Sequence, residues 1–185
     1  MTRVHQVALV SPFPFASLPR VWHWIEPFRG KVADDFAPQT LEDFIAHVSA
    51  SWKRQKTWGI VGDGELGGLI LFERLTPWLG TAHVLLKPDF QGRGVAVKAC
   101  RAAVAEMFGL GIGKLTFRVL AGNLAIGSLL VNIGARREGT QEAETLRNGE
   151  PADVWLYGLT KKTFEDKQYV VSTSGRPADV DQADE

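Results

Sequence analysis

The chain has 185 residues, of which 45% are hydrophobic, and this suits a single domain with a sizeable core. Its 21 basic and 21 acidic residues balance to a formal net charge of zero, so we expect neither nucleic acid nor an anionic membrane as a partner. No apolar run approaches the roughly 20 residues that cross a bilayer, and the N-terminus lacks a signal-peptide pattern. We therefore expect a cytoplasmic protein, in which the single Cys100 is a small buried residue.

The N-terminal part predicts one strand and two helices. Residues 5–10 are expected to form the strand, and a proline-rich break separates it from a short, aromatic-rich helix within residues 15–28. Apolar residues then recur at helical spacing from Leu41 to Val48. This spacing predicts a helix from Leu41 to about residue 54.

The middle of the chain predicts a hairpin and a third strand that runs into a glycine-rich loop. The dipeptide Asp63-Gly64 lies between apolar runs at residues 57–62 and 66–74, and Asp-Gly in this setting favours a tight turn. Residues 81–87 are the next expected strand, and an alanine-rich helix is expected from about residue 95 to 108.

The loop between that strand and that helix is suited to binding phosphate. It contains Gln91, Gly92, Arg93 and Gly94, directly before the helix start. The first N–H groups of a helix lack partners within the helix, and glycines allow an anion to approach the backbone closely. The loop lacks the Gly-Lys-Ser/Thr ending of a P-loop and the Gly-x-Gly-x-x-Gly of a dinucleotide site. An ordinary strand-to-helix turn is the other interpretation.

The second half predicts a further strand, helix and hairpin. Residues 114–119 alternate between polar and apolar side chains, as in a half-buried strand. Asn123 is a helix N-cap candidate, and the helix 124–133 is expected to end at Gly134. A glycine turn at Asn148-Gly149 predicts a closing hairpin. We expect one domain over residues 1–169 and a disordered acidic tail over 170–185.

The loop pattern Gln91-x-x-Gly94-x-Ala96, the downstream Asn123 and the closing hairpin together resemble the GNAT acetyltransferase superfamily. Their order is similar to that of the RimJ/RimL branch, which acetylates protein N-termini and, in relatives, small amines. The resemblance covers roughly residues 57–160. It implies an α/β (α+β) GNAT fold with a mixed, mostly antiparallel sheet of six or seven strands and about four helices. The sheet should be splayed between the fourth and fifth strands.

The resemblance also implies acetyl-CoA as co-substrate, an amine acceptor, no metal, and a monomer or homodimer. By analogy with the family, the pantetheine arm would pair with the edge of the fourth strand, where an N–H of Val84 or Leu85 would face the thioester oxygen. Asn123 would contact the cofactor arm or act only as an N-cap. The residues expected to bind the cofactor are Val84, Leu85, Leu86, Gln91, Gly92, Arg93, Gly94, Val95, Ala96 and Asn123.

The residues that handle protons depart from the family pattern. Many relatives have a tyrosine seven residues after the asparagine, where this chain has Leu130, and the RimJ/RimL branch often has a serine where this chain has Ile126. Ser128 is a nearby candidate, although it is rotated by about 200° from that serine position. A polar surface or packing role is the other interpretation of Ser128.

A general base has to replace the glutamate that the fourth strand often carries, because Thr81 stands in its place. His83 lies two residues further on the same strand face and is our first candidate, since its ordinary pKa of about 6.5 suits amine deprotonation. A half-buried structural histidine is the alternative. Glu73 on the preceding strand is a further catalytic candidate.

The tryptophans have two interpretations as well. Aromatic residues at this density are more often core residues, but Trp22 and Trp24 could instead line the route of the acceptor. The same question applies to Trp52, Trp58 and Trp78.

Two functions remain open from the sequence. The first is an acetyl-CoA-dependent N-acetyltransferase that acts on a primary amine, either a protein N-terminus or a small amine. The alternative is a catalytically impaired acyl-CoA-binding or scaffold protein that keeps the GNAT fold.

Overall fold

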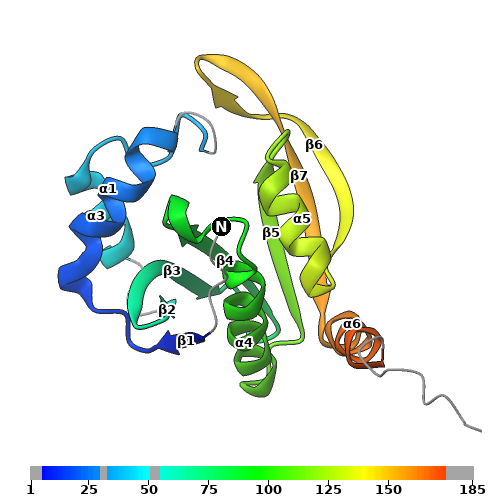
Figure 1. Ribbon diagram of the computed structural model, residues 1–185. Helices are drawn as coiled ribbons and strands as arrows, with labels where there is room; N and C mark the ends of the chain where they lie inside the picture. The colour runs from blue at the N-terminus through cyan, green and yellow to red at the C-terminus, as the bar shows by residue number, and fades with distance from the viewer. Residues whose placement is uncertain (1–5, 30–32, 51–54, 174–185) are drawn as a thin grey trace, which may run out of the picture.

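The computed structural model describes residues 6–29, 33–50 and 55–173 (Figure 1). Seven strands form one sheet in the order β1-β2-β3-β4-β5-β7-β6. The strands are β1 (Val7–Val10), β2 (Gln55–Gly62), β3 (Glu65–Arg74), β4 (Leu79–Leu86), β5 (Lys114–Leu120), β6 (Arg136–Arg147) and β7 (Glu150–Thr160). The α-helices of the described residues are α1 (Leu18–Ile25), α3 (Leu41–Ala50), α4 (Val95–Gly109), α5 (Leu124–Ile133) and α6 (Lys161–Thr173).

The sheet is mixed and mostly antiparallel, which confirms the predicted fold class. Every neighbouring pair is antiparallel except β4 and β5, which run parallel. A parallel connection needs a crossover, and α4 supplies it between these two strands. The turns that the sequence predicted are present, because Asp63, Gly64, Asn148 and Gly149 all adopt positive φ at the two hairpins.

The contact between β4 and β5 is short, and this confirms the predicted splay. Only three residue pairs join the two strands, ending at Thr81 opposite Thr116. Each strand continues beyond that point with its other neighbour, since β4 pairs with β3 as far as Leu86 and β5 pairs with β7 as far as Leu120. The two halves of the sheet therefore diverge beyond Thr81 and Thr116 (Figure 1), and we call this gap in the strand pairing the opening between β4 and β5.

Helices cover the two faces of the sheet in separate groups. Alternate residues of β3 point to opposite faces, as the period of a strand requires. Ile70 and Phe72 lie in the core that α4 and α5 cover, whereas Leu69 and Leu71 lie in the core beneath α1 and α3. The second core is the smaller one, and it places α1 and α3 against the β3–β4 half of the sheet.

Of the tryptophans weighed above, Trp22, Trp24 and Trp58 are core residues, whereas Trp78 is not. Trp22 and Trp24 belong to α1 and are buried, and Trp58 is buried and donates from Nε1 to the Glu106 carboxylate at 2.9 Å. Trp78 is 67% exposed and its ring covers Gly113. Trp52 lies outside the described residues.

Helix α6 was not expected from the sequence. The Thr160 and Thr163 side chains bond reciprocally with each other's backbone N–H groups at its start, at 3.2 Å in both directions. Phe164 is buried, and its ring lies 5.6 Å from that of Phe108. The helix runs to Thr173, four residues into the segment expected as tail, and residues 174–185 lie outside the described part of the chain. Within the described part, no helix is long and apolar enough to span a bilayer.

Candidate functional site

The free edge of β4 forms one side of the opening. Val84, Leu85 and Leu86 pair with β3 on one side, while the described strands offer them no partner on the other side beyond Thr81. Val84 and Leu86 pack toward the α4 core, and Leu85 packs toward the α1 and α3 core. An unpaired strand edge presents N–H and C=O groups to which an extended ligand can add as a further strand.

The glycine loop lies at the end of this edge and leads into α4. Gly92 and Gly94 have φ values of +70° and +75°, a conformation that favours glycine. A Cβ at either position would meet no atom within 4 Å, so the space above the loop is open. The first turn of α4 has no side-chain cap among the described residues, and Lys98 N–H makes the first bond, to the Gly94 carbonyl at 3.2 Å. Such a helix start can bind an anion through its first N–H groups, here those of Val95 and Ala96.

Three contacts fix the loop relative to the sheet. Gln91 does not point outward, because its Nε2 donates to the Leu86 carbonyl at 3.2 Å and joins the loop to the end of β4. Phe90 is buried, and its ring lies against Gly67, where an added Cβ would come within 2.5 Å of the ring. Lys87 N–H also donates to the Gly67 carbonyl at 2.8 Å. The loop is therefore held by packing and backbone bonds on the sheet side and is open on the other side.

Basic side chains near the loop differ in what they already bind. The Nε atoms of Arg93 and Arg101 are buried and have no hydrogen-bond partner among the described residues, so each could still donate to an acceptor. Lys98 is exposed on α4. Arg101 is partly engaged, because its Nη2 donates to the Asn132 carbonyl at 3.0 Å and links α4 to α5. The open glycine cradle and the orphaned Arg93 Nε both fit a phosphorylated ligand.

Asn123 acts as the N-cap that the sequence indicated. Its Oδ1 accepts from Ile126 N–H at 3.3 Å, and α5 ends at Gly134 in the left-handed region. The cap explains the choice of asparagine at this position. A contact of Asn123 with a ligand stays a prediction.

His83 and Glu73 lie together on the other face of the sheet. His83 is opposite Leu71 in the β3–β4 register and Glu73 is opposite Thr81, so both side chains share the face of α1 and α3. Burial lowers the pKa of His83 from its ordinary value of 6.5, His47 of α3 lowers it further, and Glu73 acts in the opposite direction. The side chain nevertheless keeps an exposed surface. This combination fits a side chain that has protein groups around it and still reaches solvent.

Arg118 of β5 lies on the other side of the opening from His83. The last residue pair between β4 and β5 is Thr81 with Thr116. If the same register is extended by two residues, His83 is level with Arg118, although the strands are no longer paired there. The Arg118 guanidinium donates to Gln141 Oε1 at 3.0 Å and to Glu144 Oε1 at 2.8 Å, both on β6. A histidine with a lowered pKa on β4 is thus level in register with a paired arginine on β5.

Our sequence reasoning missed His47 and Arg118. Arg118 is one of the polar residues that alternate with apolar ones over residues 114–119, so the sheet face on which it lies was predictable. Its position level with His83 depends on the strand register and was not. His47 lies between the apolar positions Phe44 and Val48 on α3 and carries no distinguishing local signal.

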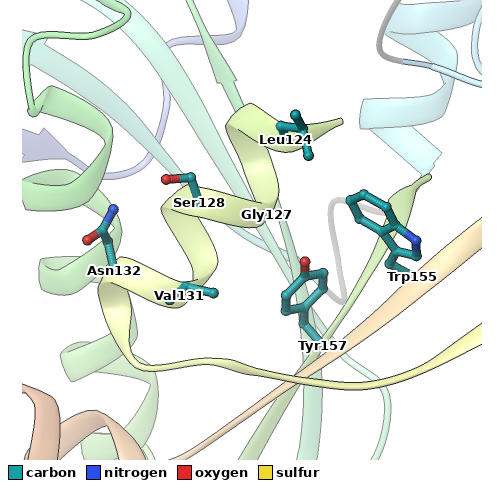
Figure 2. Close-up of a pocket in the computed structure, with 7 residues that line it drawn as sticks. All are labelled: Leu124, Gly127, Ser128, Val131, Asn132, Trp155 and Tyr157. Carbon is teal, nitrogen blue, oxygen red and sulfur yellow. The ribbon is translucent and has the colours of Figure 1, made fainter. Parts of the chain in front are cut away.

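Ser128 lies apart from His83 and Glu73. It is exposed on α5, and it lines a shallow open pocket of about 460 Å³ with Leu124, Gly127, Val131, Asn132, Trp155 and Tyr157. Figure 2 shows Ser128 and Asn132 pointing to the opposite side of α5 from Trp155 and Tyr157. Since α5 covers the other face of the sheet, the structure does not bring Ser128 together with His83 and Glu73.

At the two positions of α5 where many relatives carry a tyrosine or a serine, this chain has apolar side chains that pack in the core. Leu130 is buried at 4% exposure, and Ile126 packs against the same core. These residues stabilise the packing of α5 and offer no proton to a reaction.

The chain belongs to the acetyltransferase (GNAT) domain family, whose model matches residues 6–136. A search of curated proteins finds no match. Family membership therefore rests on the domain match, and the fold and the split between β4 and β5 agree with it.

Solved structures of similar fold include three acetyltransferases. RimJ from Mycobacterium smegmatis in complex with CoA-disulfide has a TM-score of 0.75 at 15% identity, over 91% of this chain and 89% of that one. Spermidine N-acetyltransferase from Vibrio cholerae in complex with CoA and spermine has a TM-score of 0.73 at 15% identity, over 86% and 98%. An N-acetyltransferase from Staphylococcus aureus Mu50 has a TM-score of 0.70 at 16% identity, over 84% and 99%. At these identities the likeness concerns the fold.

The electrostatics of His83 give a direct test of the site geometry. We expect His83 to titrate below 6.5, because its surroundings disfavour the charged ring. His47→Gln should raise the His83 pKa by removing a positive neighbour, and Glu73→Gln should lower it by removing a negative one. Two-dimensional NMR titration of the histidine side chains measures all three values. A His83 pKa above 6.5 that neither substitution moves would contradict the arrangement.

Proposed function

We propose that the protein is an acetyl-CoA-dependent N-acetyltransferase of RimJ/RimL type that acts on a primary amine, either a protein N-terminus or a small amine. The observation that carries this proposal is the short pairing of β4 with β5, which opens the sheet directly beside the glycine loop of α4. The opening joins two faces with different chemistry. An anion-binding loop lies on the side of α4, and a histidine with a lowered pKa lies on the side of α1 and α3.

The donor would bind along β4 and across the loop. In this proposal, the edge at Val84, Leu85 and Leu86 pairs with the pantetheine arm, and the N–H groups from Gly92 to Ala96 bind the pyrophosphate. Arg93 supplies a further donor to phosphate, since its Nε is otherwise unpartnered. Acetyl-CoA brings an already activated acyl group, so the protein mainly has to position the reactants and move protons.

The acceptor would approach on the face of α1 and α3. His83 accepts a proton from the amine as the nitrogen attacks the thioester carbonyl, directly or through a water molecule, and Glu73 stabilises the charged ring. The new N–C bond forms as the C–S bond breaks, and the departing thiolate takes up a proton. Because Leu130 and Ile126 carry no hydroxyl, solvent or the protonated His83 would supply that proton.

Donor binding is tested by calorimetry with acetyl-CoA. Gly94→Ala should weaken binding at least about tenfold, because φ near +75° costs a side chain roughly 1–2 kcal/mol and the Cβ enters the space left for the phosphate. Gly109→Ala is the matched control, at the other end of α4, where a Cβ meets nothing within 4 Å. We expect that control to bind within about twofold of the wild type. If the wild type does not bind acetyl-CoA at millimolar concentration, the proposal is wrong.

Turnover is tested by thiol release with a panel of linear amines, aminoglycosides and free-N-terminus peptides. His83→Gln should reduce kcat by about 10²–10⁴ and leave the affinity for acetyl-CoA unchanged, as loss of a general base would. For the wild type, kcat/KM should rise through a pKa below 6.5 and then level off, since the neutral ring is the active form. His23→Gln, which changes an exposed histidine of α1, is the matched control. Unchanged turnover in His83→Gln would exclude His83 as the base.

A non-catalytic acyl-CoA-binding or scaffold role is the second candidate, and the buried Leu130 in place of a tyrosine favours it. The same experiments separate the two candidates. Tight acetyl-CoA binding without thiol release across the whole panel would establish the second one.

A further inference from the structure

Strand β3 carries two consecutive glycines, Gly67 and Gly68, beside the end of β4. Both are buried, although glycine inside a strand weakens it, because it loses more conformational freedom on folding and has no side chain to pack. Glycine in the interior of a strand often marks a bulge or a place where another group comes close to the backbone. The structure shows both features here, one at each glycine.

Gly67 is the extra residue of a β-bulge. The register of β2 with β3 shifts between Ile60 and Val61, and it leaves Gly67 without a partner on β2. By strand alternation Gly67 would share the face of Leu69, which lies in the core beneath α1 and α3. A Cβ on Gly67 would instead meet Phe90, which belongs to the core under α4. The bulge therefore turns Gly67 toward the face of α4, as bulges commonly redirect a residue.

Phe90 fills the space that Gly67 leaves. A Cβ on Gly67 would come within 2.5 Å of the ring, and Phe90 is only 5% exposed, so the ring has little room to move away. Backbone bonds flank the contact, because Lys87 N–H donates to the Gly67 carbonyl at 2.8 Å and Phe90 N–H donates to the Lys87 carbonyl at 2.9 Å. We call the contact between Phe90 and Gly67 the aromatic seat. Gln91 follows Phe90 directly, so the aromatic seat fixes the start of the glycine loop relative to β3.

Gly68 has a similar relation to the edge of β4. It is opposite Leu86, and a Cβ on Gly68 would come within 2.7 Å of the Leu85 carbonyl oxygen. That oxygen is backbone, so it can give way only if β4 itself moves. Two neighbouring residues of β3 thus set the positions of two different parts of the site. Gly67 acts on the glycine loop, and Gly68 acts on the β4 edge.

An acyl-CoA donor would have to fit both of these parts at once. In the proposed function its pantetheine arm pairs with the β4 edge and its pyrophosphate binds the N–H groups of the loop. Covalent bonds fix the length of the donor between these two groups. Both sets of contacts therefore form together only when the loop lies at the matching distance from the edge, and misplacement by about 1 Å is costly.

We propose that Gly67 and Phe90 are positioning residues that hold the glycine loop at this distance and so make the enzyme select donors with the CoA pyrophosphate over acyl-pantetheine donors that lack it. This inference rests on the proposed acetyltransferase function. A donor without the pyrophosphate uses only the β4 edge, so its binding does not depend on the aromatic seat. A shift of the seat therefore costs acetyl-CoA affinity and leaves the affinity for the shorter donor unchanged.

The test compares acetyl-CoA with S-acetylpantetheine on the full-length protein. NMR chemical-shift titration measures both Kd values without an acceptor. The ratio of the S-acetylpantetheine Kd to the acetyl-CoA Kd should be at least about 30 in the wild type, because the pyrophosphate adds charge-assisted bonds to the loop. Gly67→Ala should lower this ratio at least about fivefold and change the S-acetylpantetheine Kd by less than about twofold. Gly68→Ala should weaken both donors by a similar factor, since it displaces the edge that they share.

A double variant tests whether the contact itself is responsible. Phe90→Leu added to Gly67→Ala should return the ratio to within about threefold of the wild type, because the smaller side chain makes room for the added Cβ. Phe90→Leu alone should lower the ratio, since it leaves the space over Gly67 partly empty. Gly139→Ala on β6 is the matched control, because a Cβ there meets nothing within 4 Å, and it should keep the wild-type ratio.

The outcomes separate this inference from the proposed function. A wild-type ratio in Gly67→Ala, or a double variant no better than Gly67→Ala, would overturn the role of the aromatic seat and leave the acetyltransferase function in place. If Gly67→Ala does not fold, Phe90→Leu decides, since it adds no atoms to the core, and an unchanged ratio there would overturn the inference. A wild type that shows the expected ratio but releases no thiol with any amine would overturn the acetyltransferase function and leave the seat in place.

Discussion

The early end of the pairing between β4 and β5 is the constraint on which the rest of the site depends. Each strand keeps its other neighbour, so the sheet stays continuous at one end while its two halves separate at the other. Strand twist accumulates differently in the two halves once the shared ladder stops. The separation exposes the edge of β4 beside the α4 loop and places His83 level with Arg118 across a gap. Without the split, a ligand would have neither an edge to pair with nor a route between the two faces.

Local turn and cap signals made much of the fold predictable. Asp63-Gly64 and Asn148-Gly149 occupy positive φ at the two predicted hairpins, and Asn123 caps α5 as its side chain and position indicated. Gly94 begins α4 in the left-handed conformation that only glycine adopts without strain. At these positions the residue type is dictated by a backbone geometry that can be recognised from a few neighbours. The glycine loop before α4 was predictable for the same reason.

Features that depend on tertiary contacts could not be read from the sequence. Helix α6 has little apolar periodicity, and Phe164 stabilises it by packing on a ring more than 50 residues earlier. The bonds from Thr145, Asn148 and Gly149 to the carboxylates of Asp34 and Asp35 join residues over 100 positions apart, and Asp34-Asp35 by itself has the pattern of an ordinary polar loop. The level positions of His83 and Arg118 can be read only from the register of a parallel pair of strands that are joined by three residue pairs. The face that carries His83 and Glu73 therefore depends on long-range contacts, whereas the glycine loop depends mainly on local ones.

Amide hydrogen exchange with and without acetyl-CoA tests the central claim most directly, because it reports on the backbone of the split itself. We expect slower exchange at residues 84–86 and 92–96 on binding, with no change at β1, which is the edge strand at one end of the sheet. Protection of both the β4 edge and the loop would mean that the ligand occupies the opening between β4 and β5. Saturating acetyl-CoA that leaves residues 84–86 unprotected would contradict the claim that this opening is the donor site.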